Sequence, residues 1–222
     1  MEIDHCLFPD GLLYDPENNT WSNIVKNNEV TVGVTSIISS IAGRLTSFRP
    51  KPVGSMVARG TSLGTLESEK FVGPVPSPLS GEILETNVDA TALPKLVNDS
   101  PYFDGWIAKL RPSRLDVEAP LLSSIQDSQG LFQQRIAQYH VRCFKAYPDH
   151  ELYEIGVECS AGLMKMNELI ASLPVGAIVH LVSDDPTAYV EMVRWAEASG
   201  QNLVDWRTEE NLFHFIVRKS KT

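Results

Sequence analysis

The stretch Gly64-Thr65-Leu66-Glu67-Ser68-Glu69-Lys70-Phe71-Val72 decides the fold of the first half of the chain. The segment begins with a strand-like run, continues with polar residues and ends with the strand-like pair Phe71-Val72. This pattern predicts a β-hairpin with Lys70 at or near its turn. A second tight turn is predicted shortly afterwards, at Ser77-Pro78-Leu79-Ser80-Gly81-Glu82-Ile83.

The rest of the first half also indicates β-structure, because short apolar runs recur about every ten residues between Gly and Pro positions. These runs are Val30-Thr31-Val32-Gly33-Val34, Leu63-Gly64-Thr65-Leu66, Gly81-Glu82-Ile83-Leu84 and Trp106-Ile107-Ala108-Lys109-Leu110. A short helix is expected at 36–42, ended by Gly43. Pro74, Pro76 and Pro78 lack backbone donors, so their segment is expected to be an edge strand or a rigid loop.

The second half has a different pattern. Apolar residues at helical spacing over 121–140 predict a connecting helix, and Tyr147-Pro148-Asp149-His150 indicates a boundary. From residue 151 onward the order is β-α-β-α-β-β, which predicts a two-layer α/β sandwich. We therefore expect two domains, an all-β domain at 1–112 and the α/β domain at 151–222, joined by a helical linker at 113–150.

Composition excludes several classes of protein. The 222 residues carry a net charge of -9, with both halves acidic, which argues against nucleic-acid binding. No apolar stretch is long enough for a membrane span, and the acidic start Met1-Glu2-Ile3-Asp4-His5 is unlike a secretory signal. The three cysteines, Cys6, Cys143 and Cys159, are too few and too scattered to predict disulfides or a metal site. A cytoplasmic protein with free thiols is expected.

The first half resembles the lipoyl/biotinyl carrier fold, a barrel-sandwich hybrid. Within it, the chain is similar to the H protein of the glycine cleavage system and to the lipoate-binding proteins of sulfur oxidation. The resemblance covers about residues 8–112 and rests on four segments, namely Val30-Thr31-Val32-Gly33-Val34-Thr35, Leu66-Glu67-Ser68-Glu69-Lys70, the 77–83 turn, and Leu96-Val97-Asn98-Asp99-Ser100-Pro101-Tyr102 with Gly105-Trp106.

The resemblance implies that Lys70 carries lipoate through an amide bond. A carrier lysine must be exposed to a ligase and rigidly presented, because a fixed tip lowers the ordering cost of docking. Glu67, Ser68 and Glu69 would form the presentation turn, with the two carboxylates as a recognition mark for the lipoate ligase. In contrast, Met164-Lys165-Met166 lies in a helical pattern, so we reject biotinylation at Lys165.

The second half resembles the TusA/SirA-like sulfur-carrier family over about residues 152–219. The resemblance implies that Cys159 carries a persulfide. The predicted helix behind Cys159 would stabilise its thiolate, whereas Glu158 would oppose this. The family motif Cys-Pro-x-Pro reads Cys159-Ser160-Ala161-Gly162 here, so active thiol chemistry and a mere docking role both stay open.

We therefore expect a carrier protein of sulfur metabolism, not an enzyme, which exchanges thiols with a heterodisulfide-reductase-like complex or a sulfurtransferase. The alternative is the aminomethyl carrier of glycine cleavage, with the P, T and L proteins as partners. The resemblance places a histidine near the carried group where this chain has Asn19, which cannot titrate near neutral pH and so disfavours glycine cleavage. A second alternative is an unmodified docking scaffold.

Overall fold

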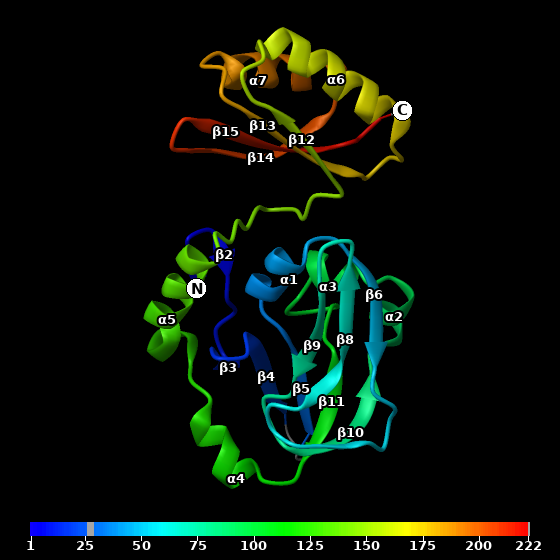
Figure 1. Cartoon of the computed structure of the whole chain (residues 1–222), viewed down its shortest axis with the longest axis vertical. Helices are drawn as coiled ribbons and strands as arrows, with labels where there is room; N and C mark the ends of the chain where they lie inside the picture. Colours follow the sequence, from blue (N-terminus) through cyan, green and yellow to red (C-terminus); the bar gives the residue numbers. More distant parts are fainter. Residues whose placement is uncertain (26–28, 222) are drawn as a thin grey trace. The chain divides into compact units, whose positions relative to one another are not determined.

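The computed structural model describes residues 1–25 and 29–221, apart from the side chain of Cys159. The chain divides into a first unit, Met1–Cys143, and a second unit, Phe144–Thr222 (Figure 1). Among the helices in these described residues, none combines the length and the apolar character needed to cross a lipid bilayer.

The first unit is built on a six-stranded sheet and a three-stranded sheet. The larger sheet has the order β3 (Leu13–Asp15), β4 (Thr20–Val25), β5 (Glu29–Val34), β11 (Ala108–Pro112), β10 (Gly81–Thr86), β7 (Met56–Val57). The smaller sheet has the order β6 (Leu45–Pro50), β8 (Ser62–Ser68), β9 (Val72–Pro76), and the short strands β1 (Glu2–Ile3) and β2 (Cys6–Leu7) pair with each other. The predicted edge position of the proline-rich segment is confirmed, because β9 lies at an edge of its sheet and contains Pro74 and Pro76.

Alternate side chains of both sheets meet in one apolar core, as expected for a sandwich. Val32 and Val34 of β5 and Leu110 of β11 belong to this core, together with Leu66 of β8 and Val75 of β9. Each large aliphatic side chain that is fully buried stabilises the fold by about 1.5–3 kcal/mol. The core therefore holds the β8–β9 hairpin firmly against the larger sheet.

The first unit also contains helices. They are α1 (Ser36–Ala42), α2 (Val88–Ala92), α3 (Leu96–Asp99), α4 (Leu115–Glu118), a 3-10 turn at Ala119–Leu121, and α5 (Ile125–Gln138). The predicted short helix is confirmed as α1, and Gly43 follows it with a φ of 72°, a conformation that favours glycine.

The segment expected to be a linker is largely part of the first unit. In α5, Phe132 and Ile136 are buried, and they pack in a cluster with Phe8 and Tyr14 from the N-terminal segment. The helical period of 121–140 correctly predicted an apolar face. It gives no indication that this face has a partner more than a hundred residues earlier in the chain, and this is why the sequence predicts only a connecting helix.

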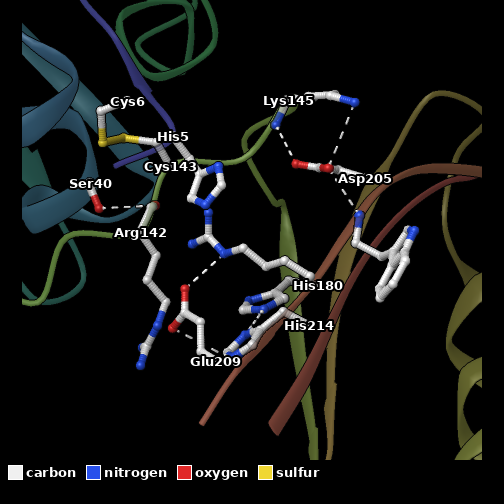
Figure 2. A network of polar contacts seen from close by, with 12 residues as sticks. His5, Cys6, Ser40, Arg142, Cys143, Lys145, His180, Asp205, Glu209 and His214 are labelled. Atoms are coloured by element: carbon white, nitrogen blue, oxygen red, sulfur yellow. Dashed lines mark hydrogen bonds and ion pairs between the residues drawn. A yellow bond between two sulfur atoms is a disulfide. The ribbon is translucent and has the colours of Figure 1, made fainter. Parts of the chain in front are cut away.

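The expectation that Cys6 and Cys143 are free thiols is wrong. They form a disulfide with a sulfur–sulfur distance of 2.09 Å, which joins the two ends of the first unit (Figure 2). Near this bond, the Ser40 hydroxyl of α1 donates a hydrogen bond to the Arg142 carbonyl at 3.4 Å. The pairing could not be inferred from cysteine spacing, because only the packing of α5 on the N-terminal segment brings residues 137 positions apart together.

The second unit is a four-stranded sheet covered by two helices. Its elements are β12 (His150–Glu154), α6 (Cys159–Ser172), β13 (Ile178–Ser183), α7 (Ala188–Ser199), β14 (Asn202–Glu209) and β15 (Leu212–Arg218), and the sheet order is β12-β13-β15-β14. Met166 of α6 and Met192 of α7 pack on Leu181 and Phe215, so both helices lie on one face of the sheet.

The opposite face of this sheet carries a buried pair of histidines. His180 of β13 and His214 of β15 point away from the helices, because side chains alternate along a strand. Their ring nitrogens lie 2.9 Å apart, and Glu209 lies 3.8 Å from His214 (Figure 2). In the described residues, no group of three or more His, Cys, Asp or Glu side chains could hold a metal ion.

Reduction of the disulfide is expected to destabilise the first unit. A cross-link between residues 137 positions apart restricts the unfolded chain strongly, so the free energy of unfolding should fall by roughly 2–5 kcal/mol on reduction. Urea unfolding with and without a thiol reductant measures this. The variant Cys6→Ser should reproduce the loss and should no longer respond to reductant, whereas Cys159→Ser should respond like the unsubstituted chain.

Candidate functional site

The turn between β8 and β9 presents Lys70. β8 ends at Ser68 and β9 begins at Val72, and Lys70 between them is exposed. The Ser68 backbone N–H donates to the Phe71 carbonyl at 2.8 Å and closes the turn. The position expected for the lysine is thus confirmed, and Figure 1 shows the hairpin ending beside α1 and α3.

The hydroxyl of Ser68 fixes this turn to α1. It donates to the carbonyl of Ala42, the last residue of α1, at 2.5 Å, and it accepts the backbone N–H of Lys70 at 3.2 Å. One side chain therefore joins the backbone of Lys70 to the helix. Without Ser68, the turn that contains Lys70 would lose this link to α1.

Gly43 lies against the stem of Lys70. A methyl group built on Gly43 would come within 2.5 Å of Lys70 Cε and 3.4 Å of its Nζ. The absent side chain leaves room for the lysine to lie along the backbone after α1. The outer part of the lysine stem therefore lies against the backbone after α1, although the residue as a whole is exposed.

The two glutamates of the turn differ. Glu67 forms an ion pair with Arg49 of β6 at 3.2 Å between Nη2 and Oε2, and it is partly buried. Such pairs at the surface contribute at most about 1 kcal/mol. Glu69 is exposed. Of the two predicted recognition groups, Glu69 is therefore the more accessible to a ligase.

The amine of Lys70 is suited to acylation. Across residues 1–25 and 29–221, no carboxylate forms an ion pair with it. Its exposure and its rigid base are what a tethered lipoyl group requires. The residues present therefore fit this cofactor.

Asn19 lies at the other end of α1. Its backbone carbonyl accepts the N–H of Thr35, the residue before the helix, at 2.9 Å, and its side chain is buried. A seven-residue helix spans about 10 Å. The helix therefore separates Asn19 from the Lys70 turn by a distance that a long flexible arm can cover.

Tyr102 holds the start of α1. Its hydroxyl accepts the backbone N–H of Ser36 at 3.1 Å. Burial raises the pKa of Tyr102 above its usual value, so this residue stays neutral at physiological pH. The start of α1 is thereby fixed by a neutral hydroxyl group.

Lys165 provides a contrast with Lys70. It lies within α6, and its amine donates to both carboxylate oxygens of the buried Glu154, at 2.9 and 2.8 Å. An amine held in this way within a helix cannot serve as a hairpin-tip carrier. The rejection of biotinylation at Lys165 agrees with this geometry.

Cys159 is the first residue of α6, so the helix begins at this cysteine and not behind it as predicted. The residue before it, Glu158, makes no capping hydrogen bond with its side chain. The thiol itself lies outside the part of the chain that the structure describes. Its role as a persulfide carrier therefore remains a prediction.

Replacing Ser68 by alanine should loosen the lysine turn. The change removes both hydrogen bonds of the hydroxyl, at a cost of about 1 kcal/mol in the free energy of unfolding. Hydrogen exchange at the Lys70 amide should become faster than in the unsubstituted chain, which mass spectrometry of short peptides measures. Ser62→Ala is the control, because the Ser62 hydroxyl bonds only to Gly64, at the far end of β8. Equal exchange at Lys70 in both variants would contradict the anchoring role.

Comparison with known proteins identifies a family for the first unit. The glycine cleavage H-protein family model matches residues 12–134, which lie entirely within this unit and exclude the second one. The glycine cleavage system H protein 5 of Aquifex aeolicus is 39% identical over 145 residues, or 64% of this chain and 98% of that protein.

Two further proteins are similar. The probable glycine cleavage system H protein 2 of Sulfolobus acidocaldarius is 37% identical over 129 residues, covering 57% of this chain and 87% of that protein. The crystal structure of a glycine cleavage system H protein from Mycobacterium marinum has a TM-score of 0.49 and 26% identity, covering 60% of this chain and all of that one. Members of the matched family are carriers, not enzymes, and hold a covalently attached lipoate on a lysine. The chain belongs to the glycine cleavage H-protein family.

Proposed function

We propose that this chain is a lipoyl carrier and that Lys70 is the lysine that a lipoate ligase acylates. The observation that carries the proposal is the exposed Lys70 at a turn whose backbone is tied to α1 through Ser68. Membership of a family of lipoyl carriers supports it. The location of the protein, which we take to be the cytoplasm, is part of the same proposal.

The lipoyl group supplies a dithiolane at the end of a long arm, on which cargo can be bound and released. This chain's own residues would present the arm. Ser68 holds the backbone of Lys70, Gly43 leaves space for the outer part of its stem, and Glu69 offers an exposed charge beside it. No proton transfer by the chain is required, which suits a carrier that visits enzymes with their own catalytic groups.

For the cargo, the aminomethyl group of glycine cleavage has the better support, because the similar proteins are named as H proteins of that system. Its partners would then be the P, T and L proteins. Asn19 is the feature that fits this cargo least well, since the buried amide offers no titratable group at that end of α1. The heterodisulfide-reductase-like complex and the sulfurtransferase have less support as partners.

Sulfur carriage is the second candidate function. Asn19 favours it, and so does the position of Cys159 at the start of a 14-residue helix, where the helix dipole stabilises a thiolate. On this proposal the second unit would be a fused TusA/SirA-like sulfur-carrier domain. A dithiol arm and a persulfide would then share thiol–disulfide exchange chemistry.

Lys70→Arg should abolish lipoylation. Arginine keeps the charge but cannot be acylated by a lipoate ligase, so the variant should keep its unmodified mass when it is incubated with ligase, lipoate and ATP. Lys165→Arg is the matched control and should gain one lipoyl group like the unsubstituted chain. Intact and peptide mass spectrometry measure both. An unsubstituted chain that stays unmodified would support the scaffold alternative and contradict the proposal.

The variant Cys159→Ser should distinguish between the two candidate cargoes, the aminomethyl group and sulfur. If the chain carries the aminomethyl group, the lipoylated variant should support glycine-dependent turnover with the P, T and L proteins as well as the unsubstituted chain does. If it carries sulfur, the chain purified from its own source should bear added sulfur on Cys159, and the substitution should abolish transfer. Peptide mass spectrometry without reductant detects the persulfide.

A further inference from the structure

Asn98 of α3 uses its whole carboxamide to hold the end of α1. Its Nδ2 donates to the carbonyls of Ser39 at 3.0 Å and Gly43 at 2.9 Å, and its Oδ1 accepts the N–H of Leu45, the first residue of β6, at 2.9 Å. The side chain is 5% exposed. These three bonds fix where α1 ends and where β6 begins.

The structure held by Asn98 is the support under Lys70. The Ala42 carbonyl, next to Gly43, accepts the Ser68 hydroxyl that also binds the Lys70 N–H. Gly43 itself lies under the lysine stem. Asn98 is therefore connected to Lys70 through two neighbouring residues, Ala42, whose carbonyl accepts the Ser68 hydroxyl, and Gly43, which lies against the lysine stem.

Gly43 meets two requirements at once. Its backbone has a φ of 72°, a conformation that residues other than glycine rarely adopt. Its missing Cβ leaves the space that the Lys70 stem occupies. A larger residue would strain the chain and displace the stem.

We propose that Asn98 and Gly43 are positioning residues that set the resting direction of the Lys70 side chain for the ligase. The proposal rests on the proposed function, in which Lys70 is the acylated residue. A ligase binds only those molecules in which the turn is in place, so its apparent affinity falls with the populated fraction of that conformation. Loss of either positioning residue should therefore raise the ligase KM and leave kcat little changed.

The first experiment compares two buried asparagines. Asn87 is 2% exposed and also makes three carboxamide bonds, to the Ala90 N–H and to the carbonyls of Asp104 and Trp106. None of these bonds reaches α1 or the Lys70 turn. Asn98→Ala and Asn87→Ala should therefore destabilise the first unit similarly, and a purely structural effect should be the same in both.

The second experiment compares two glycines of positive φ. Gly60 has a φ of 80°, close to that of Gly43, and a methyl group built on it would meet nothing within 4 Å. Gly60→Ala therefore also places a side chain at a positive φ, but it does not displace the lysine stem. This pair of variants tests the proposal even if Asn98→Ala does not fold.

Two measurements are made on the full unmodified chain. The first is KM and kcat for acylation by a lipoate ligase with lipoate and ATP, followed by intact mass. We expect KM to rise about tenfold in Asn98→Ala and Gly43→Ala, and by less than about twofold in Asn87→Ala and Gly60→Ala. The second is the position of the Lys70 amide resonance in a ¹H–¹⁵N spectrum, which should move only in the first two variants.

The outcomes separate the two proposals. Equal KM values and equal shifts of the Lys70 resonance within each pair would overturn the positioning role. If a competent ligase does not modify the unsubstituted chain, the lipoyl function fails. The Lys70 resonance then still decides the positioning role, because that measurement needs no ligase.

Discussion

A single contact meets the two opposing demands on a carrier lysine, exposure of its amine and rigidity of its backbone. The Ser68 hydroxyl bridges the Lys70 N–H and the end of α1, so the hairpin tip is attached to a helix rather than left to its own short turn. The helix end is in turn held by the buried amide of Asn98. Contacts that lead back to the core thus hold the backbone of Lys70, and Gly43 lies against its stem.

The same organisation explains why α1 matters more than its seven residues suggest. Its start is held by Tyr102 and lies beside Asn19, and its end supports the Lys70 turn. A short isolated helix is marginal in water, so tertiary contacts at both ends must keep it formed. The helix acts as a rigid spacer between the Lys70 turn and the buried Asn19.

Local patterns predicted much of this arrangement. The hairpin, the short helix ended by Gly43 and the proline-rich edge strand follow from turn residues and strand periodicity, which act over a few residues. Local patterns do not predict hydrogen bonds between residues that are far apart in the sequence. The sequence predicts no role for Asn98, because an asparagine in sequence shows neither its burial nor its three partners 53 to 59 residues away.

The same limit explains the disulfide and α5. Both depend on the packing of the N-terminal segment against residues beyond 112, and a single sequence does not reveal that pairing. Periodicity indicated which face of α5 is apolar but not what covers it. Cysteine counting failed because it treats the three cysteines as one set, whereas two of them belong to one unit and Cys159 to the other.

The disulfide also determines how the first unit responds to mechanical load. The chain enters the second unit directly after Cys143, and Cys6 lies close to the N-terminus. Tension applied between residue 144 and the first five residues would run through the sulfur–sulfur bond and bypass the whole sandwich. The hairpin that carries Lys70 would therefore remain unloaded when the two ends of the chain are pulled apart.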